Sequence, residues 1–300
     1  MEKETLTNLE FKLKKGCFVY TAELGPPKGV LIDELKTKIK ILKEAVTAVN
    51  VSDLQGSNLS LNAISISHIL YESGLEPVMQ ITCRDRNRLA LQSDVLSAYV
   101  LGIRNILCLT GDNTTTGDHP QAKPVFDLDS ITLLDVIRKL EDGYDMAGNE
   151  LKGKPVFFKG AAVNPETNLK ASFNLQLIKM KKKADCGAQF FQTMPVFNAE
   201  KFKVFMDRVK ELSINLPIIA GIQLIKSEKM ANYLNEYIPG VNVPEWIIEK
   251  ITKAENKLDM SINIAADIIR NIKPLCSGIH IGAQGWEKHI TTLIEKIGIN

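Results

Sequence analysis

Short apolar runs rich in Val, Ile, Phe or Cys recur along the 300-residue chain, and turn residues bound each of them. Such runs are typical of strands that are buried on both faces, as in a parallel sheet. The predicted strands span Cys17–Leu24, Ala45–Val51, Glu76–Cys83, Asn105–Leu109, Pro155–Val163, Gln189–Thr193, Pro217–Ile222 and Ser277–Ile281.

Longer amphipathic segments separate these runs and predict helices. They span Leu31–Ala45, Ser60–Ser73, Arg86–Leu101, Ile131–Leu140, Leu169–Ala184, Ala199–Leu212, Lys226–Tyr237 and Trp286–Ile297. Eight strands that alternate with helices in a chain of this length predict an α/β fold, a (β/α)8 TIM barrel. The alternative is an open doubly wound sheet, which needs a G-x-G-x-x-G turn after its first strand. Here that strand ends in GPPKG instead.

No linker or break in composition divides the chain, so we expect one domain over residues 1–300. Three irregular regions interrupt the pattern. Asn113–Asp129 is a polar loop after the fourth strand, and Asp142–Lys154 should lie at the opposite end of the barrel. Tyr237–Asp259 should contain an extra helix before the last strand.

The composition is that of a soluble globular protein, with 45% hydrophobic and 24% charged residues. A formal net charge of +2 gives no electrostatic footprint for nucleic acid and no polybasic membrane anchor. With neither a membrane-spanning run nor a secretory leader, we expect a cytoplasmic protein without membrane insertion. The five cysteines lack a CxxC pair and the four histidines lack ligand spacing, so we expect no metal site.

Active sites of such barrels lie at the carboxyl ends of the strands. Glu23 ends the first strand within an apolar run, where a carboxyl group should keep its proton near neutral pH and suit general acid catalysis. A glutamate that caps an amide or pairs with a lysine fits the same position, so position alone leaves its role open.

Polar residues also lie at the ends of the second, third, fourth and sixth predicted strands. Gly111 permits a ligand to approach the backbone and Asp112 could bind a cationic or amide-bearing ring, unless the two form a turn and a helix cap. Polar strand endings that could bind a heterocycle or be satisfied by backbone are Asn50, Ser52, Asp53, Gln80, Thr82 and Cys83. The segment Gln192–Phe197 could stack on a flat ring or fill the barrel mouth. Lys179–Lys183 could be a solvated helix face or a seat for phosphate.

In order along the chain, these strand ends resemble those of the methylenetetrahydrofolate reductases. The similarity runs from about Gly16 to the C-terminus, and its most specific elements are E-x-x-PP and L-x-GD. It rests on the segments AELGPPKG, VNVSD, PVMQITCRDR, NILCLTGDN, KPVFDLDSITLL, AAVNPE, DCGAQFFQTMPVFN and IAGIQ.

The resemblance implies a TIM barrel that binds a flavin, FAD or FMN, and reduces 5,10-methylenetetrahydrofolate to 5-methyltetrahydrofolate. Glu23 would be the general acid that opens the methylene bridge, and Asp112 would hold the pterin ring near the flavin. Substrate contacts would come from Ser52, Asp112, Gln192 and Met194. Flavin contacts would come from Asn50, Ser52, Gln80, Thr110, Gly111, Asp112, Asp127, Asn164, Gln176, Lys179, Lys182 and Lys183.

The chain departs from well-known bacterial members at several of these positions. It has Gln80 for a histidine, Thr110 for an arginine, Gly160 and Asn164 for a tyrosine and a histidine, and Met194 for a folate-binding glutamine. Losing the arginine removes a fixed cation with five donors, which places FMN beside FAD as the implied flavin.

The same departures open the question of the electron donor. The donor would be NAD(P)H directly or a partner electron-transfer subunit, as in family members from acetogens, and a hetero- or homo-oligomer is expected. Two alternatives remain at this point: a flavin-free barrel of the methyltransferase type that binds methyltetrahydrofolate, and a non-catalytic subunit of an electron-transfer complex.

Overall fold

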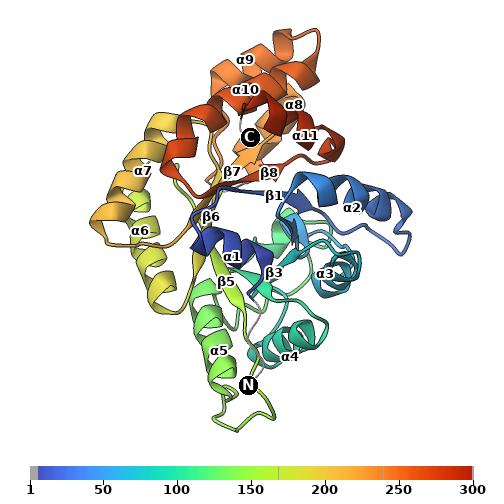
Figure 1. The fold of residues 1–300 in the computed structure, drawn as a ribbon, viewed down its shortest axis with the longest axis vertical. Coiled ribbons are helices and arrows are strands. Elements are labelled where there is room, and N and C mark those ends of the chain that lie inside the picture. Colours follow the sequence, from blue (N-terminus) through green and yellow to red (C-terminus); the bar gives the residue numbers. More distant parts are fainter. Residues whose placement is uncertain (1–5, 168, 239, 299–300) are drawn as a thin grey trace.

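A computed structural model describes residues 6–167, 169–238 and 240–298. Its parallel strands pair in chain order, and β8 also pairs with β1, so the sheet closes into a barrel (Figure 1). The (β/α)8 TIM-barrel prediction is confirmed and the open-sheet alternative is wrong. The strands are β1 (Val19–Leu24), β2 (Ala48–Val51), β3 (Pro77–Thr82), β4 (Asn105–Leu109), β5 (Phe158–Val163), β6 (Phe190–Pro195), β7 (Ile218–Gln223) and β8 (Gly278–Gly282).

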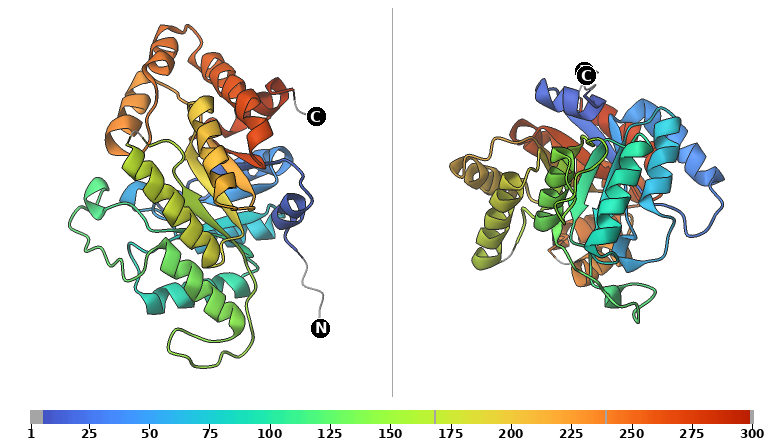
Figure 2. Two further views of the ribbon diagram at one scale, coloured as in Figure 1. Left: turned by 90° about the vertical axis from the view of Figure 1, so that its left-hand side faces the viewer. Right: turned by 90° about the horizontal axis from the view of Figure 1, so that it is seen from below.

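Helices surround this barrel, as the two views of Figure 2 show. They are α1 (Asn8–Lys14), α2 (Asp33–Ala45), α3 (Ala63–Glu72), α4 (Arg88–Val100), α5 (Ser130–Asp142), α6 (Lys170–Asp185), α7 (Ala199–Glu211), α8 (Glu228–Tyr237), α9 (Glu245–Lys253), α10 (Lys257–Ile272) and α11 (Ile290–Lys296). Short 3₁₀ turns are η1 (Gln55–Ser57), η2 (Thr114–Thr116), η3 (Lys273–Leu275) and η4 (Glu287–His289). The extra helix expected within Tyr237–Asp259 is α9.

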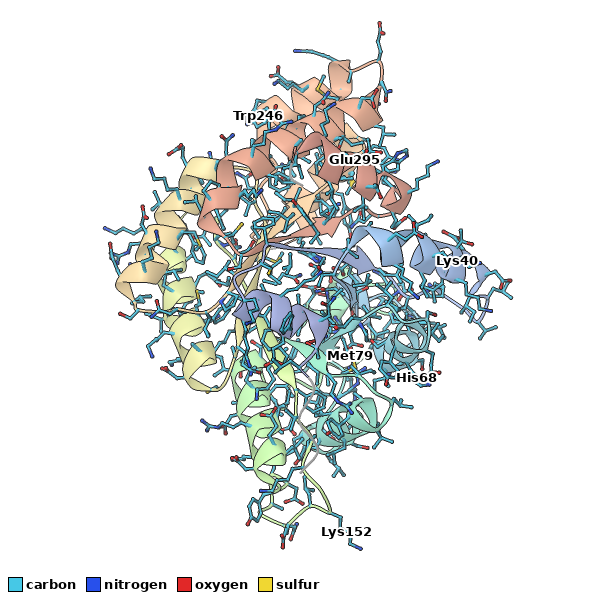
Figure 3. All side chains as sticks on the ribbon, in the orientation of Figure 1. Lys40, His68, Met79, Lys152, Trp246 and Glu295 are labelled. Atoms are coloured by element: carbon cyan, nitrogen blue, oxygen red, sulfur yellow. The ribbon has the colours of Figure 1, made fainter. Side chains whose placement is uncertain are left out.

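The strands have little contact with solvent because helices cover one face and the barrel interior covers the other. Every residue of β2 and β3 is buried, which explains why these strands appear in the sequence as continuous apolar runs. Figure 3 shows Met79 of β3 among the strands, whereas Lys40 and Lys152 lie at the periphery. In the described part of the chain, no helix is long and apolar enough to cross a bilayer.

At the amino-terminal ends of the strands, the barrel interior is filled by an apolar cluster that includes residues of α1. Leu9 and Leu13 of this helix are buried, and together they pack against the inward-facing side chains of the strands. Those side chains are Val19, Ala48, Val78, Leu107, Phe158, Phe190 and Ile219. Helix α1 therefore closes the amino-terminal end of the barrel.

Polar contacts hold α1 in this position. The Glu76 carboxylate accepts hydrogen bonds from the backbone N–H groups of Asn8 and Leu9, at 2.6 and 2.9 Å. Its Oε1 also accepts from the side-chain amide of Asn105, which in turn accepts from the Thr7 hydroxyl. A carboxylate at a helix N-terminus satisfies N–H groups that have no partner within the helix. The pattern of apolar residues did not predict α1.

The loop Asn113–Asp129 lies at the other end of the barrel from α1, as the left view of Figure 2 shows. It is fastened to neighbouring loops by Asp118, which pairs with Lys28 and accepts a 3.0 Å hydrogen bond from Leu59 N. Gly117 lies so close to the Ser57 carbonyl that a Cβ atom would fall 1.9 Å from its oxygen. A side chain at Gly117 would therefore separate this loop from the one that follows β2.

We expect Leu9→Ala to lower the free energy of unfolding by about 2–5 kcal/mol, because it leaves a cavity at the bottom of the barrel. Urea denaturation followed by circular dichroism measures this change. Phe11→Ala is the matched control, since Phe11 lies on the same helix but is 49% exposed. Equal effects of the two substitutions would contradict the role given to α1.

Candidate active site

Glu23 lies at the carboxyl end of β1 in contact with two other strands. Its Oε2 atom is 2.9 Å from His280 Nε2 on β8, and Gln80 Nε2 on β3 lies 3.4 Å from both carboxylate oxygens. The other ring nitrogen of His280 is 3.0 Å from the hydroxyl of buried Thr21. Side-chain exposure is only 16% for Glu23 and 9% for His280. The strands thus hold a carboxyl group in a fixed position that retains limited access to solvent.

A second polar pair spans the barrel beside this cluster. The Asn50 side-chain amide on β2 donates a 2.8 Å hydrogen bond to Gln192 Oε1 on β6, and both side chains are buried. Asn50 Oδ1 and the buried hydroxyl of Ser52 have no hydrogen-bond partner within the described residues. Unpaired buried polar atoms are costly in a folded protein, so their presence at a strand end indicates a place for polar groups of a ligand.

Asp53, the next residue along from Ser52, has a structural role. Its buried carboxylate accepts hydrogen bonds from Thr82 N and Thr82 Oγ1, at 2.8 and 2.9 Å, and forms a two-pronged ion pair with Arg86. These bonds tie the end of β2 to the end of β3. They fix the backbone beside Ser52, so Asp53 is a satisfied structural residue and is not available to a ligand.

A groove of about 630 Å³ lies between the end of β4 and the start of α5, within the size range of ligand pockets. Gly111 adopts a φ of +98°, and a Cβ atom there would fall 2.9 Å from the Cβ of Arg84. The hydroxyl of Thr110 is 3.2 Å from that of Ser130 at the start of α5. The groove is lined by Thr110, Gly111, Asn113, Phe126, Asp127, Leu128, Asp129 and Thr132.

Two carboxylates of this groove are already engaged by protein groups. Asp127 forms an ion pair with Arg88 and accepts from its backbone N–H, and these hydrogen bonds lower the pKa of Asp127 to about 2. Burial raises the pKa of Asp129, but hydrogen bonds from Thr132 and Ile131 outweigh burial and hold it below its usual range. Asp127 therefore anchors the loop to α4, and Asp129 caps α5.

The basic residues of α6 divide between two environments. Lys183 is half-buried and donates a 2.7 Å hydrogen bond to the Ala162 carbonyl of β5. Burial lowers the pKa of Lys183 to about 8, the nearby charge of Lys179 lowers it as well, and Asp129 opposes them. Gln176, Lys179 and Lys183 recur at helical spacing and share one face of α6. Lys182 is exposed.

The remaining predicted residues lie on or after several different strands. Asp112 follows the end of β4 and is exposed, whereas Met194 lies half-buried on β6. Asn164, just after β5, bonds Gly240 O at 2.9 Å and Glu166 N at 3.0 Å, so it fastens loops together. Buried Glu166 accepts from the backbone of Phe197 and Asn198 after β6.

His280 is the site residue that the sequence analysis missed. The β1–β8 register places it beside Thr21, and the β7–β8 register places it beside Gly221. The available signal was a histidine at the centre of the short apolar strand GIHIG, flanked by glycines. Its partner Glu23 lies 257 positions away in the chain, so the pairing depends on barrel closure.

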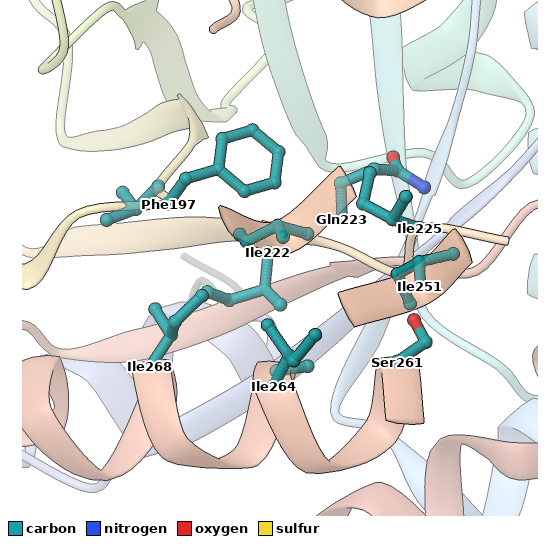
Figure 4. Close-up of a pocket in the computed structure, with 11 residues that line it drawn as sticks. Phe197, Ile222, Gln223, Ile225, Ile251, Ser261, Ile264 and Ile268 are labelled. Carbon is teal, nitrogen blue, oxygen red and sulfur yellow. The ribbon is translucent and has the colours of Figure 1, made fainter. Parts of the chain in front are cut away.

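Neither a second cavity nor a metal-binding cluster in the described part of the chain adds to this site. A small apolar cavity of about 10 Å³ lies between β7, α9 and α10, with room for about one water molecule (Figure 4). In the figure, Ser261 stands beside the labelled isoleucines of this cavity. Within the described residues, no cluster of three His, Cys, Asp or Glu side chains could hold a metal ion.

A closed parallel barrel that gathers a carboxyl group, an imidazole and amides at its strand ends has the architecture of a barrel enzyme. The family model "Methylenetetrahydrofolate reductase" matches residues 8–298, and the chain belongs to this family of oxidoreductases.

Curated relatives agree with this assignment. The chain is 26% identical over 281 residues to the 5,10-methylenetetrahydrofolate reductase of Buchnera aphidicola subsp. Schizaphis graminum, covering 90% of this chain and 85% of that protein. It is 26% identical over 255 residues to the Escherichia coli K12 enzyme, covering 83% and 77%.

Among solved structures, a Clostridium thermocellum protein has the same fold. Its TM-score is 0.66 at 15% sequence identity, and the match covers 97% of this chain and 99% of that one. That protein is described as binding two copies of 5-methyl-5,6,7,8-tetrahydrofolic acid. At this level of identity the match supports the barrel fold.

The environment of Lys183 predicts a pH dependence of stability. With its pKa at about 8 in the folded protein against an ordinary value of 10.5, the unfolded chain binds more protons between these two values. The lysine therefore makes the free energy of unfolding rise with pH in this window. We expect the stability of Lys183→Met relative to the natural chain to fall between pH values of about 8 and about 10.

Urea titrations of both proteins without added ligand, at several pH values across this window, test the expectation. Lys182→Met is the matched control, since Lys182 is exposed on the same helix, and its stability relative to the natural chain should stay constant. A constant difference for Lys183→Met as well would show that Lys183 keeps an ordinary proton affinity.

Proposed function

We propose that this protein reduces 5,10-methylenetetrahydrofolate to 5-methyltetrahydrofolate with a flavin bound at the carboxyl end of the barrel. The observation that carries the proposal is the position of Glu23, held by His280 and Gln80 at the strand ends of a chain from this family. The single barrel, residues 1–300, would serve as the catalytic domain. The Clostridium thermocellum neighbour is described as binding 5-methyl-5,6,7,8-tetrahydrofolic acid, which supports a folate as a ligand of this fold.

The residues at this end fit a flavin. A flat heterocycle with several hydrogen-bonding atoms suits the unpaired Asn50 Oδ1 and Ser52 hydroxyl. Gly111 allows the backbone after β4 to turn with a φ of +98° against Arg84 and Thr82, and the adjoining groove is large enough for a cofactor tail. Lys183 and Lys179 are the cations that would face a phosphate group on this side, with Gln176 on the same helix face.

A bound flavin would supply the hydride that converts the methylene carbon to a methyl group. The protein would supply the proton and the orientation. Glu23 gives its proton to the bridge nitrogen as the carbon–nitrogen bond breaks, and the bonding electron pair stays on that nitrogen. The remaining iminium is cationic, so the Glu23 carboxylate formed in this step stabilises it. The Glu23 side chain is only 16% exposed, so the carboxyl group is largely shielded from bulk water but remains within reach of a substrate at the barrel mouth.

Asp112 would bind the pterin ring beside the flavin. Its exposed position after Gly111 leaves the carboxylate free to accept hydrogen bonds from the amino and ring N–H groups of a pterin. The buried amides of Gln192 and Asn50 already bond each other, so the substrate contact proposed for Gln192 uses its remaining N–H groups. Half-buried Met194 on the same strand would pack against the ring.

Electrons would reach the flavin from a partner subunit rather than from NAD(P)H bound to this chain. Thr110 supplies a neutral hydroxyl bonded to Ser130, where well-known relatives place a cation before the Gly-Asp pair. Gly160 carries no aromatic ring, because a Cβ atom there would fall 2.2 Å from the Phe190 ring. The change at Thr110 would remove a cation from the groove after β4, and the change at Gly160 would leave no aromatic ring at this position of β5.

Replacing the acid tests the mechanism. We expect Glu23→Gln to bind flavin and folate about as tightly as the natural chain but to reduce folate roughly 10²- to 10⁴-fold more slowly, since proton transfer is lost. The measurement is single-turnover reoxidation of the photoreduced flavoprotein by methylenetetrahydrofolate. Glu34→Gln, at an exposed position on α2, is the control. Folate reduction at the natural rate by Glu23→Gln would overturn the assignment of the acid.

Purification tests the cofactor and its donor. We expect the chain, alone or reconstituted, to hold a flavin that absorbs near ~450 nm, and heat release with chromatography then identifies FAD or FMN. Anaerobic NADH should bleach the isolated chain much more slowly than the complex with its partner. Equal bleaching would contradict the partner proposal, and a chain that takes up no flavin would favour the flavin-free folate barrel.

A further inference from the structure

Glu23 is the end of a chain of three hydrogen-bonding side chains inside the barrel. The Thr21 hydroxyl lies 3.0 Å from His280 Nδ1, and His280 Nε2 lies 2.9 Å from Glu23 Oε2. Thr21 and His280 are buried, and the carboxyl group faces the mouth with limited exposure. Both ring nitrogens of His280 are therefore occupied, one by a hydroxyl and one by the proposed acid.

The backbone leaves room for this imidazole and fixes its position. Inward-facing residues alternate along β8, and the two next to His280 on that face are Gly278 and Gly282. The register neighbour on β7 is Gly221, which also has no side chain. A Cβ at Gly278 would meet Val19, and one at Gly282 would meet Gln223, so larger residues would disturb this layer.

We propose that His280 is the positioning residue of Glu23. The Nε2–H group of His280 donates a hydrogen bond to Glu23 Oε2, and the Thr21 hydroxyl favours this tautomer by donating a hydrogen bond to Nδ1. The inference rests on the proposed function, because it assigns a role relative to the acid of that reaction. A hydroxyl can donate to an unprotonated ring nitrogen, and the other nitrogen then carries the hydrogen.

This arrangement determines where the acidic proton lies. When Oε2 accepts from His280, the proton of the carboxylic acid occupies Oε1, whose contact among the described side chains is the long 3.4 Å approach of Gln80 Nε2. Oε1 gives this proton to the bridge nitrogen, and Glu23 becomes a carboxylate that keeps its bond from His280. The imidazole only orients the carboxyl group in this step, so one proton moves and no second transfer is needed.

The other polar and charged side chains near Glu23 on β2 and β3 are not suited to orient its carboxyl group in place of His280. The side chains of β2 and β3 that face the pair, Asn50 and Gln80, are amides, which do not titrate. The carboxylate after β2, Asp53, is bound to Arg86 and Thr82. The imidazole is thus the titratable side chain in hydrogen-bonding contact with Glu23.

Kinetics of two substitutions separate positioning from simple packing. We expect His280→Leu to slow folate reduction by the photoreduced flavoprotein roughly 10- to 100-fold, as loss of an orienting partner does, with little change in the half-saturating folate concentration. His280→Gln places an amide N–H near the Nε2 position and should recover most of the rate. His68→Leu, which removes a histidine on α3, is the control.

Oxidation of the same reduced flavoprotein by a quinone provides an internal reference, since that reaction needs no acid at the folate site. His280→Leu should keep the natural quinone rate. Slowing of both reactions by the same factor would mean that the substitution disturbs the barrel, and an unchanged folate rate would mean that Glu23 needs no partner. Either result overturns the inference.

Nitrogen-15 NMR of the four histidines tests the tautomer without any turnover. The His280 resonances, assigned by their loss in His280→Gln, should show hydrogen on Nε2 and none on Nδ1 in the natural chain. Thr21→Val should abolish this preference. A hydrogen on Nδ1 in the natural chain would refute the tautomer assignment.

The two proposals fail in different ways. A natural chain that binds no flavin or does not reduce methylenetetrahydrofolate refutes the proposed function before any variant is compared. A natural chain that reduces folate alongside a fully active His280→Leu variant refutes the positioning role alone.

Discussion

Closure of the barrel is the constraint on which the site depends. Eight parallel strands that pair in a ring enclose an interior that must be filled, and its lower half is filled by apolar side chains and by α1 from below. Solvent and ligands can therefore reach the interior only at the carboxyl ends. A polar side chain on the carboxyl-terminal side of the apolar layer needs a hydrogen-bond partner on another strand or from a ligand, because the apolar layer keeps water from the amino-terminal end.

The polar layer follows from this limit. Thr21, His280, Glu23 and Gln80 connect β8, β1 and β3, while Asn50 and Gln192 join β2 to β6. These bonds cross between strands whose positions are fixed by the sheet, so the carboxyl group is oriented before any substrate binds. Asp53 and Arg86 extend the same rigidity to the backbone at the mouth. What remains unpaired, Asn50 Oδ1 and the Ser52 hydroxyl, indicates where a ligand has to contribute.

The sequence predicted the strands and the barrel, because fully buried strands are continuous apolar runs whose ends are easy to locate. It could not predict α1, a short helix whose Leu9 and Leu13 have meaning only against the closed barrel floor. Nor could it pair Glu23 with His280 or Asn50 with Gln192, since these residues meet only after closure. Burial separated Lys183 from Lys182, a distinction that a run of lysines conceals. The flavin and substrate roles of these residues stay predictions.

Residues that differ from those of well-known relatives make specific contacts within this chain. Gln80 contacts the acid, Thr110 bonds the start of α5, and Asn164 joins two loops. Gly160 is required because Phe190 occupies the space that a side chain would need, and that ring stacks on Phe158 at 4.8 Å. Reverting one such residue alone would therefore create a clash or an unpaired group. Three of these positions, Thr110, Gly160 and Asn164, lie in or just after β4 and β5, while Glu23, Thr21 and His280 form a continuous chain of hydrogen bonds. The hydrogen bonds from Thr21 through His280 to Glu23 therefore do not involve the positions that differ in or after β4 and β5.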